Sequence, residues 1–103
     1  MKVKIQGKEY ELHYSLGGHF VYESVFKEPY KGDTMMSTYM LFWAMLAYCN
    51  REEFSMSHTD FIDAMTEEPQ PFLDFCDLMT AYYAKFEKAV DQNNKKKVAK
   101  TKT

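Results

Sequence analysis

The chain has 103 residues, a length that limits it to one domain of ordinary size. Its formal net charge is −2. Five of its thirteen basic residues lie at the C-terminal end, so residues 1–94 carry a charge of −7. An acidic body argues against a nucleic-acid-binding surface on the folded part. The strand-like N-terminal segment argues against a secretion signal. Aromatic residues make up 17% of the chain and eight methionines accompany them, which predicts a core with apolar surface left over.

The first fourteen residues predict a β-hairpin. Apolar and polar residues alternate over residues 3–5 and again over residues 10–14, which is the period of strands with one buried face. Gly7 between them can adopt the positive φ of a tight turn. Because two strands alone are only marginally stable, we expect their apolar face to pack on helices.

A glycine pair, Gly17-Gly18, leads into a short helix that ends at the proline and glycine of residues 28–32. We expect Phe20 on the inward face of this helix and Tyr22 nearer solvent. Glycines before a helix can bind an anion, but no further phosphate-binding pattern follows. A strand-to-helix turn explains the pair better.

The segment from Thr34 to Asn50 has no charged residue. Asp33 or Thr34 can cap a helix here. A membrane span needs roughly 20 predominantly apolar residues, so this shorter segment with polar interruptions predicts a buried, central helix. A helix that is apolar on all sides is central or meets another molecule. We expect at least one of its side chains to face a partner, the candidates being Tyr39, Met40, Phe42, Trp43 and Tyr48.

Two more helices follow. Ser57 can cap a short one, and the prolines at 69 and 71 precede the last helix, whose apolar stripe extends to Val90. Asn93 and Asn94 mark its expected end. We therefore predict an α+β fold, mainly α, with an N-terminal β-hairpin packed on a bundle of about four helices. This domain spans residues 1–92, and residues 93–103 form a basic, disordered tail.

No combination of residues predicts catalysis. The histidines are scattered and lack the paired spacing of a zinc site, and the adjacent carboxylates at 52–53 and 67–68 point in different directions on a helix. Cys49 and Cys76 lie in apolar surroundings without a nearby histidine, which favours buried free thiols in a reducing cytosol. We therefore expect no enzymatic activity, no catalytic residue, no metal and no cofactor.

The succession of elements resembles a known family. The hairpin sequence VKIQGKEYELHY leads through SLGG into a short helix with a glutamate, then into a long apolar helix and a last amphipathic one. This layout is similar to that of the tail assembly chaperones of long-tailed bacteriophages and prophages, over about residues 2–90. The matching residues are Ile5, Gly7, Lys8, Glu9, Tyr10, Leu12, Gly18 and Glu23.

The resemblance implies a non-enzymatic role in phage tail assembly, in the cytoplasm of the bacterial host and outside the mature virion. Such chaperones bind and solubilise the tape measure protein and help to recruit tail tube subunits. Many are also made in a longer form by ribosomal frameshifting, which an A-rich run encoding residues 93–97 would permit. Self-association into a homo-oligomer is a further expectation, while neither nucleic acid nor membrane is expected as a partner.

One alternative comes from a different class. A small homo-oligomeric helical regulator, antitoxin-like or transcription-associated, would have a similar size and helix content. Such a protein needs a basic helix that reads a groove of DNA. The acidic body of this chain does not supply one.

Overall fold

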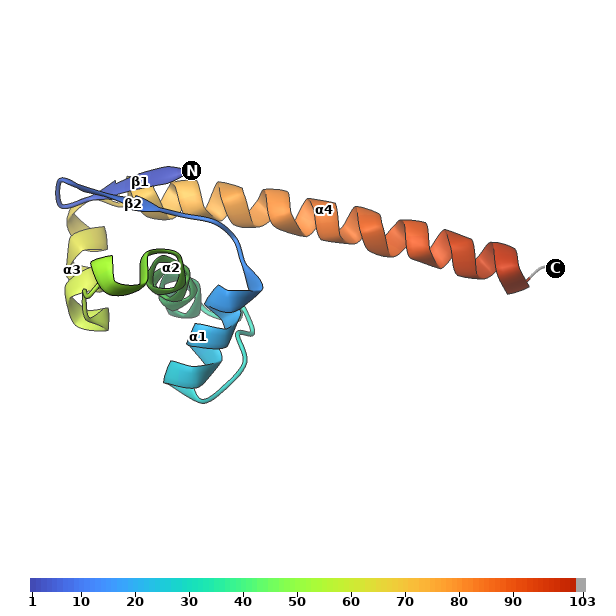
Figure 1. The fold of residues 1–103 in the computed structure, drawn as a ribbon, viewed down its shortest axis with the longest axis horizontal. Coiled ribbons are helices and arrows are strands. Elements are labelled where there is room, and N and C mark those ends of the chain that lie inside the picture. The colour runs from blue at the N-terminus through green and yellow to red at the C-terminus, as the bar shows by residue number, and fades with distance from the viewer. Residues whose placement is uncertain (102–103) are drawn as a thin grey trace.

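The computed structural model describes the backbone of residues 1–101 and the side chains of residues 1–92. The fold is mainly helical with a two-stranded antiparallel hairpin at its start, as predicted (Figure 1). The elements are β1 (Lys2–Ile5), β2 (Lys8–Glu11), α1 (Leu16–Phe26), α2 (Met35–Asn50), the short 3₁₀ helix η1 (Arg51–Glu53), α3 (His58–Glu67) and α4 (Gln70–Thr101).

The hairpin is closed by a two-residue turn. Ile5 pairs with Lys8, and both intervening residues have positive φ, 52° at Gln6 and 80° at Gly7. Two consecutive positive φ values define the turn whose twist matches that of paired strands. Val3, Ile5 and Tyr10 are buried on the side that faces the helices, and intervening residues are exposed. The predicted alternation is therefore confirmed.

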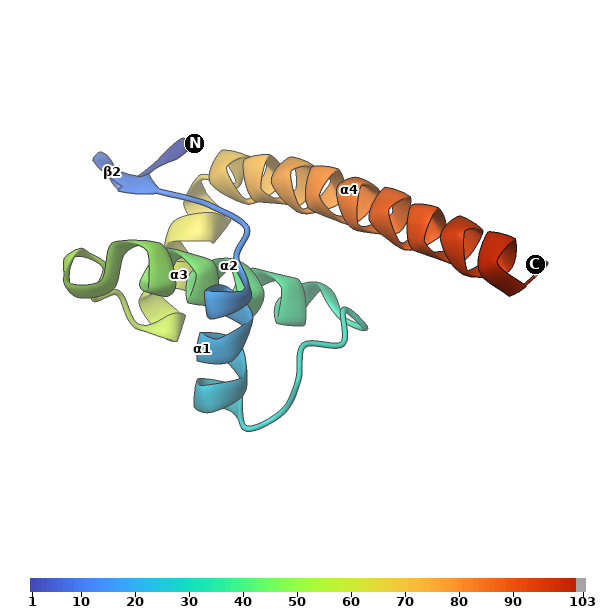
Figure 2. The same ribbon diagram turned by 45° about the vertical axis from the view of Figure 1, so that its right-hand side comes forward.

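Helix α2 occupies the centre of the body. Figure 2 shows it crossing α1, with α3 beside it and the hairpin and the first turns of α4 above it. The helix begins where Thr34 accepts a hydrogen bond from the backbone N–H of Ser37, at 3.0 Å, which satisfies a backbone donor that has no partner within the helix. Its buried side chains come from nearly every side of the helix, as expected for a central element.

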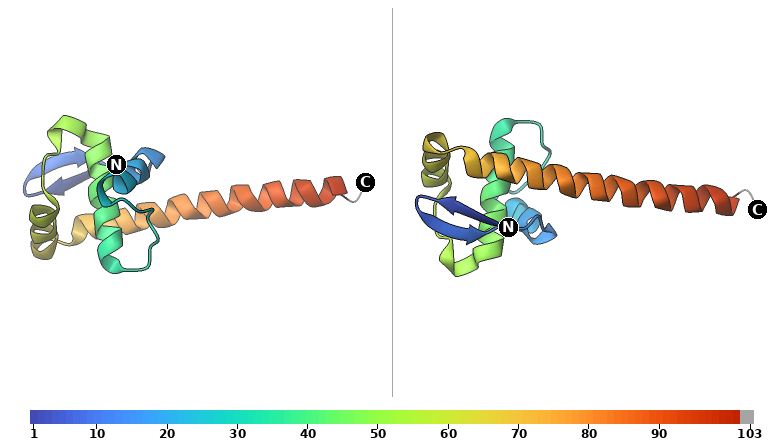
Figure 3. Two further views of the ribbon diagram at one scale, coloured as in Figure 1. Left: turned by 90° about the horizontal axis from the view of Figure 1, so that it is seen from below. Right: turned by 90° about the horizontal axis from the view of Figure 1, so that it is seen from above.

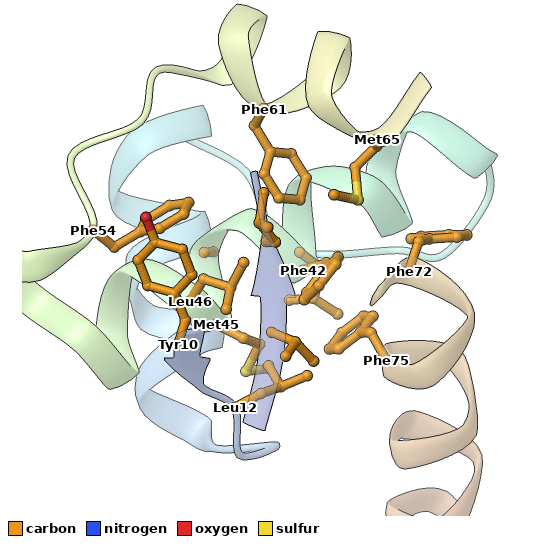
Figure 4. Packing of buried hydrophobic residues seen from close by; sticks show 14 of the residues in the cluster. Tyr10, Leu12, Phe42, Met45, Leu46, Phe54, Phe61, Met65, Phe72 and Phe75 are labelled. Carbon is orange, nitrogen blue, oxygen red and sulfur yellow. The ribbon is translucent and has the colours of Figure 1, made fainter. Parts of the chain in front are cut away.

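The core is built around aromatic rings from α2, α3 and α4 (Figure 4). The ring of Phe42 stacks on that of Phe75 with centroids 4.9 Å apart, and it meets the ring of Phe61 edge to face at 5.3 Å. All three side chains are fully buried. Each such burial contributes about 1.5–3 kcal/mol before packing terms are counted, so these rings anchor α3 and α4 to α2.

The inward face of α1 differs from the predicted one. Tyr22 is buried with 5% exposure, whereas Phe20 is 71% exposed. The reason is the glycine pair: Gly17 and Gly18 bring the backbone of α1 against side chains of α2. Two residues along a helix turn the side chain by about 200°, so Tyr22 shares the face of Gly18 and Phe20 points away.

Helix α4 is longer than the sequence predicted. It has 32 residues and continues to Thr101, so the expectation that it ends at Asn93 and Asn94 was wrong. Its length of about 48 Å explains the elongated outline of the molecule, 58 × 27 × 25 Å, and both views in Figure 3 show it extending beyond the body. The proposed division of the chain at residue 92 stays a prediction, and residues 102–103 lie outside the described part.

Candidate interaction surface

Two of the five side chains predicted to face a partner lie inside the molecule. Phe42 is fully buried between rings of α3 and α4, and Met40 is also buried. Neither presents a surface in this structure, so the expectation for these two residues was wrong. The physical reason is that the hairpin and α4 cover parts of the α2 surface that the sequence pattern of α2 alone could not show to be covered.

Two further candidates are half-buried and held by specific contacts. The ring of Tyr39 lies flat on that of Phe72, with centroids 3.7 Å apart. The indole N–H of Trp43 donates to the backbone carbonyl of Met56 at 2.8 Å, and the indole meets the imidazole of His58 at 4.2 Å. These contacts give both aromatic residues a role within the fold.

Tyr48 is the one of the five that is exposed. The guanidinium of Arg51 lies 5.7 Å from the centre of its ring, and a Cβ added at Gly17 would overlap the same ring. Tyr48 therefore covers the first turn of α1 while keeping part of its surface open. A role of this residue in binding a partner stays a prediction.

Besides Tyr48 and the N-terminal Met1, other large apolar side chains on the helices are exposed, and none of them was among the predicted candidates. They fall into two groups. The first lies on α1 and at the start of α2 and comprises Leu16, Phe20, Val25, Met35 and Met36. The second lies on α4 and comprises Leu73, Phe86 and Val90, with Tyr83 close to them in exposure.

Leu16 and Phe20 form the outer face of α1. They are 75% and 71% exposed, and their spacing of four residues places them side by side on one helix face. We call this pair the α1 patch. Its face is opposite the one where Gly18 contacts Met45 of α2. The glycine pair was the signal that could have located the patch, because adjacent glycines in a helix mark the side where another element approaches closely.

The α4 stripe is the second apolar surface. Its residues recur at spacings of three and four along one face of the helix and are Phe72, Phe75, Met79, Tyr83, Phe86 and Val90. The first of these are buried or half-buried against the body, whereas Phe86 is 57% exposed. The inward face of α4 thus continues past the body into solvent.

A polar cluster joins α1 and α4 where the stripe leaves the body. The hydroxyl of Tyr14 lies 2.7 Å from Nε2 of His19 and donates to the hydroxyl of Tyr83 at 3.0 Å. The Tyr14 ring also stacks on Tyr82, with centroids 4.2 Å apart. Burial raises the pKa of Tyr14, to which the hydrogen bond with Tyr83 adds, and burial lowers the pKa of His19. Both shifts favour the uncharged forms of Tyr14 and His19.

The titratable side chains offer little chemistry elsewhere. Cys49 and Cys76 are free thiols, and burial, with the nearby charge of Asp77, raises the pKa of Cys76, which makes it a poor nucleophile. Within the described residues, no group of three or more histidine, cysteine, aspartate or glutamate side chains converges to hold a metal ion. No helix in that part of the chain combines the length and apolarity required to cross a membrane.

In comparisons with protein-family models, curated proteins and solved structures, no match to this chain was found. The residues of the hairpin motif have structural roles in this fold. Ile5, Tyr10 and Leu12 are buried, Gly7 takes the positive φ of the turn, and Nζ of Lys8 donates to the carbonyl of Glu53 at 3.1 Å. The motif therefore positions the hairpin against the helices, and the exposed apolar faces are separate from it.

Proposed function

We propose that this protein is a non-enzymatic phage tail assembly chaperone that binds and solubilises the tape measure protein and helps to recruit tail tube subunits. It would act in the cytoplasm of the bacterial host and be absent from the mature virion. The proposal rests on the resemblance of residues 2–90 to that family and on one structural observation, the exposure of the α1 patch.

The α1 patch suits binding of an apolar helix face. Leu16 and Phe20 are the two most exposed large apolar side chains on α1, and they belong to a helix that is anchored to α2 on its other side. Adjacent apolar residues on a rigid helix can pack against an amphipathic helix of a partner. Met35 and Met36 at the start of α2 are also exposed, and flexible thioethers adapt to helix faces that differ in detail.

Charge supports a protein partner over nucleic acid. Residues 1–94 carry a charge of −7, and a surface with this sign repels phosphate backbones. The alternative of a DNA-associated regulator therefore lacks the basic helix that it requires. A helical regulator that acts through protein contacts alone would share the same apolar faces, and the experiment below separates it from the chaperone.

The test is co-expression with helical segments of the tape measure protein from the same phage. We expect the wild-type protein to keep these segments in the soluble fraction and to co-purify with them. Leu16→Ser and Phe20→Ser should reduce the soluble fraction several-fold, because both remove apolar surface that is needed for contact. Leu73→Ser is the matched control, since Leu73 is 52% exposed but lies on α4.

Two results would contradict the proposal. If tape measure segments stay insoluble when co-expressed with the wild-type protein, the proposed chaperone function is wrong. If Phe20→Ser and Leu73→Ser reduce the soluble fraction of the segments equally, the α1 patch is not the binding surface. The neighbouring genes give an independent test, because a tube protein gene upstream and a long, helix-rich reading frame downstream are expected for this family.

A further inference from the structure

The α4 stripe has an unpartnered segment with a defined start. Up to Tyr83 the stripe faces the body, where the hydroxyl of Tyr83 accepts from Tyr14. One and two turns later on the same face, Phe86 and Val90 are 57% and 39% exposed. Helix residues with large apolar side chains in such a row normally pack against another element. The continuity of the exposed part with the packed part indicates that another helix extends this interface.

The charge along α4 points to what that element is. Residues 70–84 contain Asp74 and Asp77 and no basic residue, residues 85–92 contain two residues of each sign, and residues 93–103 contain five lysines. The body from which α4 extends is acidic, whereas the far end of the helix is basic, and Figure 1 shows these regions at opposite ends of the molecule. The two ends of the long axis therefore carry charges of opposite sign, negative on the body and positive at the far end of α4.

We infer that the α4 stripe is a self-association seam on which a second copy of this chain packs its own α4 in antiparallel orientation. Antiparallel pairing directs the lysine-rich end of each copy towards the acidic body of the other, which is electrostatically favourable. Parallel pairing would bring two lysine-rich ends together. The charge distribution thus selects both the occupant and its direction.

The seam is centred between Phe86 and Val90. In a two-fold arrangement the same patch serves both copies, so Phe86 of one copy packs near Val90 of the other and the axis passes near residue 88. Lys85, Glu87, Lys88 and Asp91 lie off the stripe, and they balance in charge. The seam therefore has an apolar centre flanked by charged residues, which is the usual composition of paired amphipathic helices.

The test is the oligomeric state of the full chain, measured by sedimentation equilibrium without any other protein. We expect a reversible dimer at concentrations on the order of 100 µM, weakened by added salt. Phe86→Glu should raise the dissociation constant at least about tenfold. Leu73→Glu is the control on the other side of α4 and should not raise the constant, because its added negative charge faces the lysine-rich end of the partner. A wild-type monomer at this concentration, or equal effects of both variants, would overturn the proposal.

Cross-linking tests the direction. With Cys49 and Cys76 replaced by alanine, chains with Tyr83→Cys mixed with chains with Asn93→Cys should form a disulfide-linked dimer under mild oxidation. Each kind alone should not, because two copies of position 83 are about 15 Å apart along an antiparallel pair. Efficient cross-linking of either variant with itself would contradict the antiparallel seam.

The proposed seam and the proposed function can be tested independently of each other. Phe20→Ser should leave the dimer intact, because the α1 patch lies outside the seam. Loss of the dimer in Phe86→Glu with tape measure binding retained would support both proposals. A wild-type protein that binds tape measure segments as a monomer would overturn the seam alone.

Discussion

Gly18 of α1 lies so close to Met45 of α2 that a Cβ atom at position 18 would be 2.1 Å from the Met45 sulfur. Met45 is fully buried, so its thioether cannot swing out into solvent to make room for a methyl group. This contact fixes which side of α1 faces the interior. It therefore also determines that Leu16 and Phe20 face outward.

Gly18→Ala should destabilise the protein by about 1–3 kcal/mol, because the added methyl group overpacks a closed contact. In an ordinary helix the same change would stabilise. Gly17→Ala is the matched control: its Cβ would meet the ring of Tyr48, which is partly exposed and can swing outward, so the loss should be smaller. Urea denaturation measures both, and a larger loss for Gly17→Ala would contradict the assigned contact.

Phe42→Ala should cost about 3–5 kcal/mol of the free energy of unfolding, since it leaves a cavity among buried rings. Phe20→Ala should change it by no more than about 0.5 kcal/mol, because Phe20 is exposed. Both variants truncate a phenylalanine, Phe42 in the buried core and Phe20 on the exposed surface. Thermal unfolding followed by circular dichroism compares them, and similar losses would show that the two environments are wrongly assigned.

Asn50→Ala should destabilise the hairpin. The Asn50 side chain accepts from the backbone N–H of Glu11 and donates to its carbonyl, both at 2.9 Å, so it pairs with the open edge of β2. We expect a loss of about 1–2 kcal/mol and faster hydrogen exchange of the Glu11 amide. Glu11→Ala keeps these backbone bonds and should have little effect. An unchanged exchange rate in Asn50→Ala would contradict this role.

His19 should make stability depend on pH. Burial lowers its pKa in the folded state below the ordinary value of 6.5, and the charge of Glu23 opposes this shift. Because the unfolded chain then takes up the proton more readily, stability is fully present above pH 6.5 and falls as the pH drops towards the folded pKa. His19→Gln should flatten this part of the stability profile. An identical slope in wild type and His19→Gln would contradict the prediction.

The fold was largely predictable from local patterns. Alternation and Gly7 predicted the hairpin. The uncharged segment predicted the central helix with a cap at Asp33 or Thr34, and the structure uses Thr34. These features depend on neighbours in the chain, which the sequence displays directly. The extent of α4 was not predictable in the same way, because consecutive asparagines and lysines are compatible with a helix but do not favour it.

The exposed surface was predictable only in part. A helix that is apolar on every side, such as α2, does not reveal which rings other elements will cover, and Met40 and Phe42 were therefore misassigned. On α1 the aromatic residues alone suggested that Phe20 faces inward. Only the close approach permitted by Gly18 reverses that assignment, and such a contact depends on a residue 27 positions later, Met45.

The most direct test of the proposed function is titration calorimetry of the purified protein with a purified tape measure helix. We predict saturable binding by the wild-type protein, a dissociation constant raised at least about tenfold by Phe20→Ser, and unchanged binding by Leu73→Ser. Both side chains are exposed, Phe20 at 71% and Leu73 at 52%, so a general loss of apolar surface would weaken binding in both variants. Binding that is absent in the wild type, or equally weakened by both substitutions, would contradict the account.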